Sequence, residues 1–155
     1  MIETRPATPE DEAFLRRLFQ SVRSAEYAPL SLPEAQFAAL IDMQFRAQRM
    51  QYRATFPEAA YSILREDGAP IGNLTVDRSG DSIHIVDVNL LPERRGQGIG
   101  TEVLTGLQKE AASEGKPLSL QVAATNPAQN LYRRLGFQQT SDDGIYIRME
   151  WMSPE

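Results

Sequence analysis

The residues with the clearest chemical potential are three closely spaced glycines, in the segment Arg94-Arg95-Gly96-Gln97-Gly98-Ile99-Gly100. An apolar run from Ile85 to Leu91 precedes this segment, and a helical pattern from Ile99 to Ala112 follows it. Glycine can adopt positive φ and places no Cβ between the backbone and a ligand. The unpaired N–H groups and the dipole at a helix N-terminus both favour an anion. The segment therefore predicts a site for a ligand that carries phosphates, held mainly by main chain.

The spacing of these glycines excludes two common nucleotide loops. A P-loop ends in Gly-Lys-Ser or Gly-Lys-Thr, whereas the single Gly-Lys pair of the chain, Gly115-Lys116, is followed by Pro117. A dinucleotide fingerprint needs a third glycine three residues after the second, and the two positions in question hold Thr101 and Val103. The pattern that remains is Arg95, two residues, Gly98, one residue and Gly100.

A second motif follows, from Asn126 to Phe137, with the sequence Asn-Pro-Ala-Gln-Asn-Leu-Tyr-Arg-Arg-Leu-Gly-Phe. The two motifs together resemble the GNAT superfamily of N-acetyltransferases. Its acyl-CoA pyrophosphate loop is written [Arg/Gln]-x-x-Gly-x-[Gly/Ala], and its second motif is Asn…Ala…Leu-Tyr…Gly-Phe. The segment Val86 to Glu93 also resembles the family's fourth strand and its Pro-Glu exit. The resemblance is strong over residues 83–137 and concerns only the order of elements outside them.

Composition indicates an ordinary globular protein. The 155 residues are 41% apolar and 24% charged, which predicts a single domain over residues 1–155, by resemblance an N-acetyltransferase domain. The absence of cysteine excludes disulfides, thiolate zinc sites and a cysteine nucleophile, and we expect no metal. No signal segment follows Met1 and no run is long enough to span a bilayer, so we expect a cytoplasmic protein without a membrane partner.

The distribution of charge agrees with an anionic ligand. A net charge of −5 argues against nucleic acid as a partner. Four arginines nevertheless lie in or beside the two motifs: Arg94, Arg95, Arg133 and Arg134. The guanidinium group forms a planar fork that suits phosphate. Solvated surface charge is the alternative interpretation for some of them.

Hydrophobic periodicity and turn residues predict an α/β (α+β) fold. A Thr8-Pro9 cap opens a helix with apolar residues up to Val22, and residues 24–32 interrupt it. A capping box at Ser31 to Glu34 opens a second helix. Phe45 and Tyr52 belong to its buried face, and its remaining Gln- and Arg-rich surface over residues 44–53 should be exposed. A third helix begins at Ile99 and stops at Gly115, and a short fourth runs from Asn126-Pro127 to Leu135. Strands are expected at residues 2–7, 61–65, 71–77, 82–91, 118–122, 137–140 and 145–151.

The predicted architecture is a mixed, mostly antiparallel sheet of six or seven strands flanked by four helices. Three strands should form an antiparallel meander, and the helix after the glycine loop should lead into a parallel crossover. The same order is that of the GNAT fold, and the resemblance implies that strands four and five splay apart.

The resemblance also implies how acetyl-CoA, the co-substrate, would be bound. The backbone of the glycine loop and the first helical turn would hold the pyrophosphate. Backbone groups of the fourth strand would pair with the extended pantetheine arm, and two asparagines of the second motif would contact it. The expected CoA-binding residues are Val88, Leu90, Arg95, Gly96, Gln97, Gly98, Ile99, Gly100, Thr101, Asn126 and Asn130. For Asn126 a helix N-cap is the alternative role, and for Asn130 a place on the helix surface.

Two residues are predicted to be catalytic. Tyr132 stands where many family members carry a tyrosine that protonates the leaving thiolate; packing against a helix face is the alternative. Asp87 lies within the fourth strand, where burial would raise its pKa and suit a general base; a structural hydrogen bond is the alternative. Strict alternation would place Asp87 on one face with Ile85 and Asn89, and His84 on the other.

The expected function is direct transfer of an acetyl group to a primary amine of a small molecule or peptide, in a ternary complex. A non-catalytic acyl-CoA sensor with the same fold is the alternative. The acceptor has no readable motif, although Glu26 and Tyr27 lie in a segment that lines the acceptor site in the family. Many family members are dimeric, so a homodimer is among the expected assemblies.

Overall fold

One seven-stranded sheet organises the chain in the computed structural model, which describes residues 2–27 and 31–154 but not the side chains of residues 25–27. The strand order is β1-β2-β3-β4-β5-β7-β6. Neighbouring strands are antiparallel except β4 and β5, which are parallel. The strands are β1 (Ile2–Pro6), β2 (Ala60–Glu66), β3 (Ala69–Asp77), β4 (Ile83–Leu90), β5 (Leu118–Ala123), β6 (Gln138–Asp142) and β7 (Tyr146–Trp151). The predicted meander and parallel crossover are confirmed.

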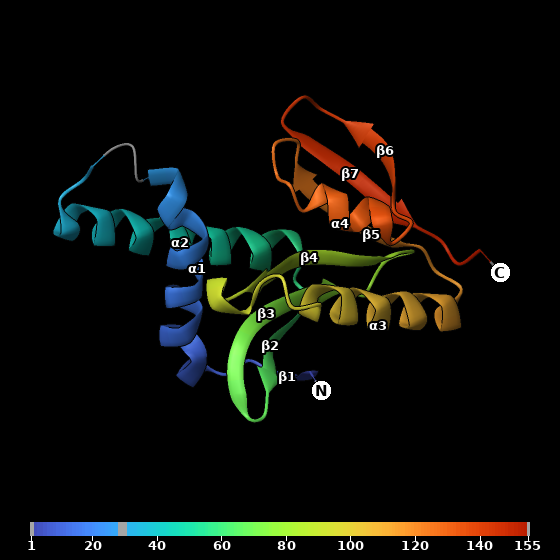
Figure 1. Cartoon of the computed structure of the whole chain (residues 1–155), viewed down its shortest axis with the longest axis horizontal. Coiled ribbons are helices and arrows are strands. Elements are labelled where there is room, and N and C mark those ends of the chain that lie inside the picture. Colours follow the sequence, from blue (N-terminus) through green and yellow to red (C-terminus); the bar gives the residue numbers. More distant parts are fainter. Residues whose placement is uncertain (1, 28–30, 155) are drawn as a thin grey trace.

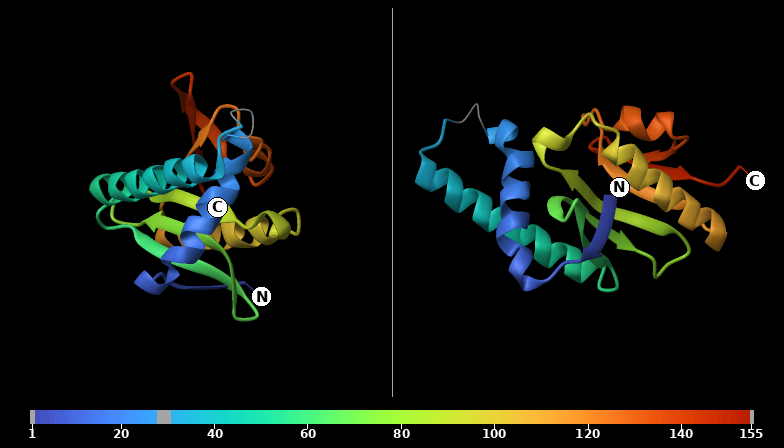
Figure 2. Two further views of the ribbon diagram at one scale, coloured as in Figure 1. Left: turned by 90° about the vertical axis from the view of Figure 1, so that its left-hand side faces the viewer. Right: turned by 60° about the horizontal axis from the view of Figure 1, so that its bottom comes forward.

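Helices cover both faces of the sheet (Figures 1 and 2). Within the described residues they are α1 (Glu12–Tyr27), α2 (Glu34–Thr55), α3 (Ile99–Glu114) and α4 (Gln129–Arg134). Short 3-10 turns precede α1 at Pro9–Asp11 and α3 at Pro92–Arg94. Helices α1 and α2 cross each other on one face, while α3 and α4 lie on the other. None of these helices is both long and apolar enough to cross a membrane.

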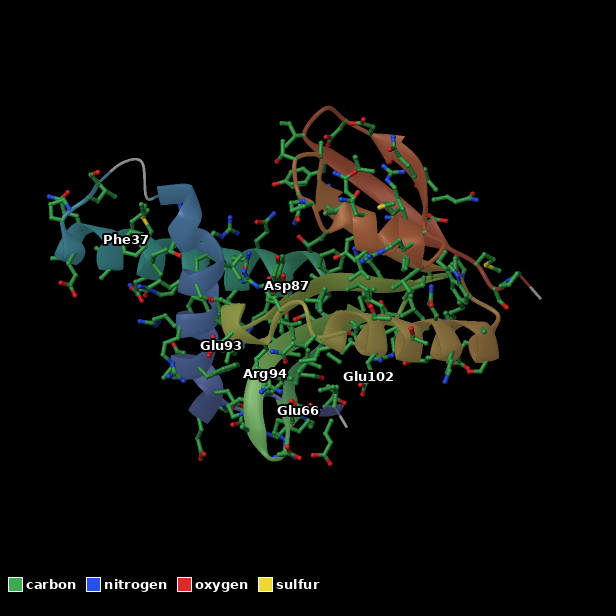
Figure 3. All side chains as sticks on the ribbon, viewed as in Figure 1. Phe37, Glu66, Asp87, Glu93, Arg94 and Glu102 are labelled. Carbon is green, nitrogen blue, oxygen red and sulfur yellow. The ribbon has the colours of Figure 1, made fainter. Side chains whose placement is uncertain are left out.

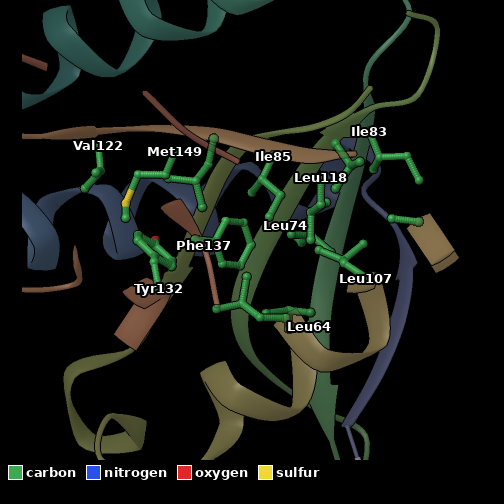
Figure 4. Packing of buried hydrophobic residues seen from close by; sticks show 14 of the residues in the cluster. Leu64, Leu74, Ile83, Ile85, Leu107, Leu118, Val122, Tyr132, Phe137 and Met149 are labelled. Atoms are coloured by element: carbon green, nitrogen blue, oxygen red, sulfur yellow. The ribbon is translucent and has the colours of Figure 1, made fainter. Parts of the chain in front are cut away.

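The larger core lies between the sheet and the α3–α4 layer (Figure 4). Its centre combines Leu107 of α3, Ile85 of β4 and Met149 of β7, each at most 5% exposed. Phe137 and Tyr132 close this core at its α4 end. A buried leucine or isoleucine side chain contributes roughly 1.5–3 kcal/mol, so this layer holds the glycine loop and the second motif in a fixed relation.

The carboxylate of Asp11 stabilises the turn that leads into α1. Asp11 accepts two hydrogen bonds from the Arg5 guanidinium, both at 2.7 Å, and one from the Thr8 N–H at 2.8 Å. These contacts hold the pKa of Asp11 far below its ordinary value, with the Arg5 hydrogen bond as the largest cause. The predicted Thr8-Pro9 start is confirmed, although the first turn is 3-10 and α1 begins at Glu12.

Two helix boundaries differ from the predictions. Helix α1 continues to Tyr27 instead of stopping near Val22, and the Ser24 hydroxyl bonds back to the Ser21 carbonyl at 3.3 Å inside the helix. The capping box predicted at Ser31 is wrong, because Pro33 is the N-cap of α2 and no side chain caps it. Ser31 lies two residues before this N-cap and has a φ of +50°.

Candidate active site

The glycine loop presents a row of unpaired backbone donors. Within the described part of the chain, the N–H groups of residues 96–101 have no hydrogen-bond acceptor, and the first loop-to-helix bond is from Glu102 to the Gly98 carbonyl, at 3.0 Å. Gly96 and Gly98 have φ of +74° and +81°, and a Cβ on either would meet open space. Gly98 is the N-cap of α3. The loop therefore has the donors, the backbone conformation and the clearance that a pyrophosphate needs.

The side chains of the loop divide between internal contacts and solvent. Arg94 forms an ion pair with Glu66 at the end of β2 (Figure 3), so it anchors the loop to the sheet. The Arg95 Nε donates to the Leu90 carbonyl at 3.3 Å, and the Gln97 amide donates to the Glu93 carbonyl at 3.1 Å. Thr101 is exposed in the first turn of α3. Ile99 is buried in the core, so it can offer a ligand only its backbone.

Strands β4 and β5 separate beside this loop. They pair only over three residues of each, at Ile83–Leu118, His84–Ser119 and Ile85–Leu120. From Val86 onward β4 stays paired with β3 but leaves β5, which continues with β7 as its partner. Val88 and Leu90 lie on this diverging segment, and their side chains pack into the core beneath α3. The splay implied by the family resemblance is therefore present.

A β-bulge lies where β4 separates from β5, and it changes the face of the sheet on which the following residues of β4 lie. Val76 of β3 pairs with Ile85, whereas Thr75 pairs with Asp87, which leaves Val86 as an extra residue. Ile85 therefore faces α3, while Asp87 faces α1 and α2. The expectation that Ile85 and Asp87 share a face was wrong, because it assumed an uninterrupted alternation.

Asp87 lies at the base of a cavity of about 90 Å³ between the sheet and helices α1 and α2. Figure 3 shows it on β4, next to α2. Asn73 donates to the Asp87 carboxylate at 3.3 Å, and Asn89 donates to the Asn73 carbonyl oxygen at 3.1 Å. Burial raises the pKa of Asp87, against the opposing effect of the two asparagines and the Arg23 charge. This perturbation is what a general base near neutral pH requires.

Tyr132 approaches the splay from the opposite layer. It lies on α4, is 9% exposed and packs against Phe137 with ring centroids 5.8 Å apart. Its hydroxyl has no hydrogen-bond partner among the described residues. Burial, and then the Asp87 charge, raise the pKa of Tyr132, so the phenol keeps its proton at neutral pH. The Tyr132 side chain therefore both packs in the core and retains a proton that it can donate.

His84 is occupied by structural contacts. Its Nδ1 lies 2.9 Å from the Ser119 hydroxyl, and its ring stacks on Phe56 with centroids 5.4 Å apart. Burial lowers the pKa of His84, and Arg148 adds to this effect. Because Phe56 follows α2, His84 faces the α1–α2 layer and not the face that alternation predicted.

The remaining predicted residues surround α4. The Asn126 side-chain oxygen accepts from the Ala128 N–H at 2.9 Å, so it shapes the turn before α4, but Ala128 and not Asn126 is the N-cap of that helix. Asn130 is exposed and Arg134 is exposed, while Arg133 donates to Gln129 at 3.2 Å. The side chains of Glu26 and Tyr27 lie outside the described residues. The described residues include no group of three or more potential metal ligands.

Several cavity residues were not predicted. Asn73 and Thr75 are polar residues in the apolar strand β3, and that alternation was a usable signal. Arg49 of α2 also lines the cavity, although the Gln- and Arg-rich surface of this helix was expected to be exposed. Tyr52, which was expected on the buried face of the same helix, lines the cavity as well. Burial, followed by the Asp87 charge, raises the pKa of Tyr52 well above its ordinary value.

Comparisons with known proteins agree with this geometry. The model of the acetyltransferase (GNAT) family matches residues 17–137. The chain belongs to this family. A protein of Bacillus subtilis (strain 168), named provisionally as a ribosomal protein bS18-alanine N-acetyltransferase, is 31% identical over 84 residues. That alignment covers 53% of this chain and 56% of the relative, so the chain spans about half the length of the curated relative it matches.

Solved structures share the fold of this GNAT chain. The PaiA N-acetyltransferase of Thermoplasma acidophilum, in complex with coenzyme A, has a TM-score of 0.73 at 20% identity, over 98% of this chain and 99% of that one. A spermidine N-acetyltransferase SpeG K23-Q34 chimera from Vibrio cholerae and hSSAT has a TM-score of 0.65 at 18% identity, over 97% and 95%. The predicted fold class is confirmed, and these identities are too low to transfer an acceptor.

Proposed function

We propose that the protein is an N-acetyltransferase that transfers the acetyl group of acetyl-CoA directly to a primary amine of a small molecule or peptide. The observation that carries this proposal is the arrangement at the splayed edge. Asp87 reaches it from the α1–α2 side and Tyr132 from the α3–α4 side, and the unpaired amides of residues 96–101 lie at its end. Membership of the GNAT family and the coenzyme A complex of a structural neighbour support it.

The residues fit acetyl-CoA as a co-substrate. The N–H groups of residues 96–101, with Gly96 and Gly98 at positive φ, would hold the pyrophosphate. The backbone of Val88 and Leu90, on the part of β4 that has left β5, would pair with the pantetheine arm. Thr101 and Asn130, both exposed, would add polar contacts. Acetyl-CoA supplies a thioester whose acetyl carbon accepts the attacking amine.

The chemistry balances with two side chains. The amine nitrogen forms the bond to the acetyl carbon, the carbon–sulfur bond breaks, and its electron pair leaves with sulfur. Asp87 accepts the proton that the amine loses, as its raised pKa allows, and releases it to solvent after product leaves. Tyr132 donates a proton to the sulfur and recovers one from solvent. Because both groups act on one complex, no acetylated enzyme is formed.

The test is a set of primary amines incubated with the purified protein and acetyl-CoA. It should include free amino acids, a polyamine and short peptides. Thiol release measured together with product mass should show one acetylated amine for each CoA released. Binding of acetyl-CoA measured by calorimetry, without turnover of any amine, would contradict the proposal and favour an acyl-CoA sensor.

A further inference from the structure

The cavity above Asp87 has a polar base and apolar walls. Its base is formed by side chains of β3 and β4, among them Asn73, Asp87 and Asn89. Leu18 and Phe45 contribute to its walls from α1 and α2. Ile85 is the last residue of β4 that pairs with β5, and Asp87 lies two residues after it. The base of the cavity therefore adjoins the splayed edge. An acceptor amine beside Asp87 would therefore have the rest of its molecule between the sheet and the two helices.

Positive charge gathers at another side of this cavity. Arg49 of α2 lines it, is half-buried, and lies over the Phe45 ring at 5.3 Å from the centroid. Arg53, one turn further, lies over the ring of Tyr61, another lining residue, at 5.9 Å. Within the described part of the chain, neither Arg49 nor Arg53 forms an ion pair with a carboxylate.

Two other arginines of these helices, Arg16 and Arg46, do have carboxylate partners. Arg16 pairs with Glu12 at 3.0 Å and with Asp42 at 2.5 Å, and Arg46 pairs with the same Asp42. The carboxylate partners of Arg16 and Arg46 thus lie on the helix surface and do not pair with Arg49 or Arg53. Burial lowers the pKa of Arg49, and the neighbouring charge of Arg53 adds to this effect. A half-buried guanidinium group such as that of Arg49, beside the like charge of the exposed Arg53, is stabilised by an external anion.

Tyr61 provides an independent indication of a missing acceptor. Its hydroxyl is buried and has no hydrogen-bond partner among the residues that the structure describes, and the charges of both Arg53 and Arg49 act on it. A buried, unpaired hydroxyl costs free energy. A ligand oxygen bound between the two guanidinium groups would pair with it.

From these contacts we infer that the acceptor is a free amino acid with an apolar side chain. This inference rests on the proposed function. The amine of this acceptor meets Asp87, its carboxylate meets the group formed by Arg49, Arg53 and Tyr61, and its side chain contacts the apolar wall. The cavity is complementary to a molecule with a cationic and an anionic end. Polyamines, which are cationic throughout, and peptide N-termini, which lack the carboxylate, should be poor acceptors.

The experiment compares three molecules that differ at one group: phenylalanine, phenylalaninamide and phenethylamine, with spermidine as a fourth acceptor. The kcat/KM for acetylation should be about 10- to 100-fold higher for phenylalanine than for the other three, as expected for charge-assisted hydrogen bonds to one carboxylate. Leucine against isoamylamine repeats the comparison with an aliphatic side chain. Equal rates within the pairs, or a preference for spermidine, would overturn the inference and leave the proposed function standing.

Two variants of α2 test whether Arg49 binds the carboxylate of the acceptor. Arg49→Gln should raise the KM for phenylalanine about tenfold or more, with little change in kcat, and should remove the preference over phenethylamine. Arg46→Gln is the matched control, one turn earlier on α2 and paired with Asp42, and it should keep the preference. Circular dichroism checks that both variants fold. An unchanged preference in Arg49→Gln would contradict the role of this arginine, while acetyl-CoA binding without turnover of any acceptor would contradict the proposed function itself.

Discussion

Substitution of Gly98 by alanine tests two properties that depend on this glycine: the stability of the fold and the binding of CoA. Gly98 is the N-cap of α3 with a φ of +81°, so an alanine there is strained whatever space surrounds it. The cost of this conformation for a residue with a Cβ is about 1–2 kcal/mol. For a chain of this length each kcal/mol lowers Tm by roughly 2–4 °C. Because a new Cβ would meet no atom within 4 Å, no steric clash adds to this cost in the free protein.

The same Cβ would stand in the open space before the unpaired amides, where we place the pyrophosphate. Loss of one or two hydrogen bonds to a charged group costs about 1.5–3 kcal/mol each, so Gly98→Ala should weaken CoA binding at least tenfold. Gly98→Val, with a larger side chain, should abolish it. The assay is isothermal titration calorimetry with CoA, combined with thermal unfolding of the free proteins.

Gly115 offers a matched control at the other end of the same helix. It is the C-cap of α3, its φ is +66°, and a Cβ there would also meet no atom within 4 Å. Sixteen helical residues separate the two glycines, which corresponds to about 24 Å. Gly115→Ala should therefore lower Tm by a similar amount and leave the Kd for CoA unchanged. Equal Kd values for both alanine variants would refute the placement of the ligand.

Three further outcomes are expected. Tyr132→Phe should lower kcat by roughly 10²–10⁴ with less than a threefold change in the Kd for CoA; an unaltered kcat measured by thiol release would remove this residue from the mechanism. Asp87→Asn should lower kcat/KM by a similar factor, yet raise Tm by a few degrees at pH 7. The reason is that a carboxyl whose pKa is raised in the folded state destabilises the fold progressively as pH rises through and above its ordinary value of 3.8; a lower Tm across pH 4–8 would contradict this. Asp11→Asn should have the opposite effect on stability and lower the free energy of unfolding at pH 7, because Arg5 and Thr8 lower the pKa of Asp11. Its contribution, about 1–2 kcal/mol by analogy with other caps, is present above pH 3.8 and lost as pH falls below it, so chemical denaturation of wild type and variant should converge in acid and differ at pH 7.

Local chemistry could be predicted well from this sequence. The spacing of Gly96, Gly98 and Gly100 marks the loop, because positive φ and close approach of a ligand depend on residues that are adjacent in the chain. The helix stop at Gly115 follows from the same rule, and its φ is +66°. The strands and their order along the chain were also predictable, since the period-two pattern and the turns around them are local signals.

The arrangement around Asp87 could not be predicted in the same way. A bulge at Val86 reverses the alternation, and nothing in the type of that residue marks it. The position of Arg49 in the cavity lining was not predicted, because exposure on α2 depends on where α1 crosses it, which is a tertiary contact. The capping box at Ser31 has the right residues, but the chain enters α2 through Pro33 instead.

A crystal structure of the protein with CoA would show directly where the ligand lies. The pyrophosphate oxygens should lie about 2.7–3.2 Å from backbone nitrogens of residues 96–101. The pantetheine arm should lie beside Val88 and Leu90, in the opening between β4 and β5, with the sulfur within reach of the Tyr132 hydroxyl. CoA bound away from the glycine loop, or with its sulfur outside the splayed edge and remote from both Tyr132 and Asp87, would contradict this placement.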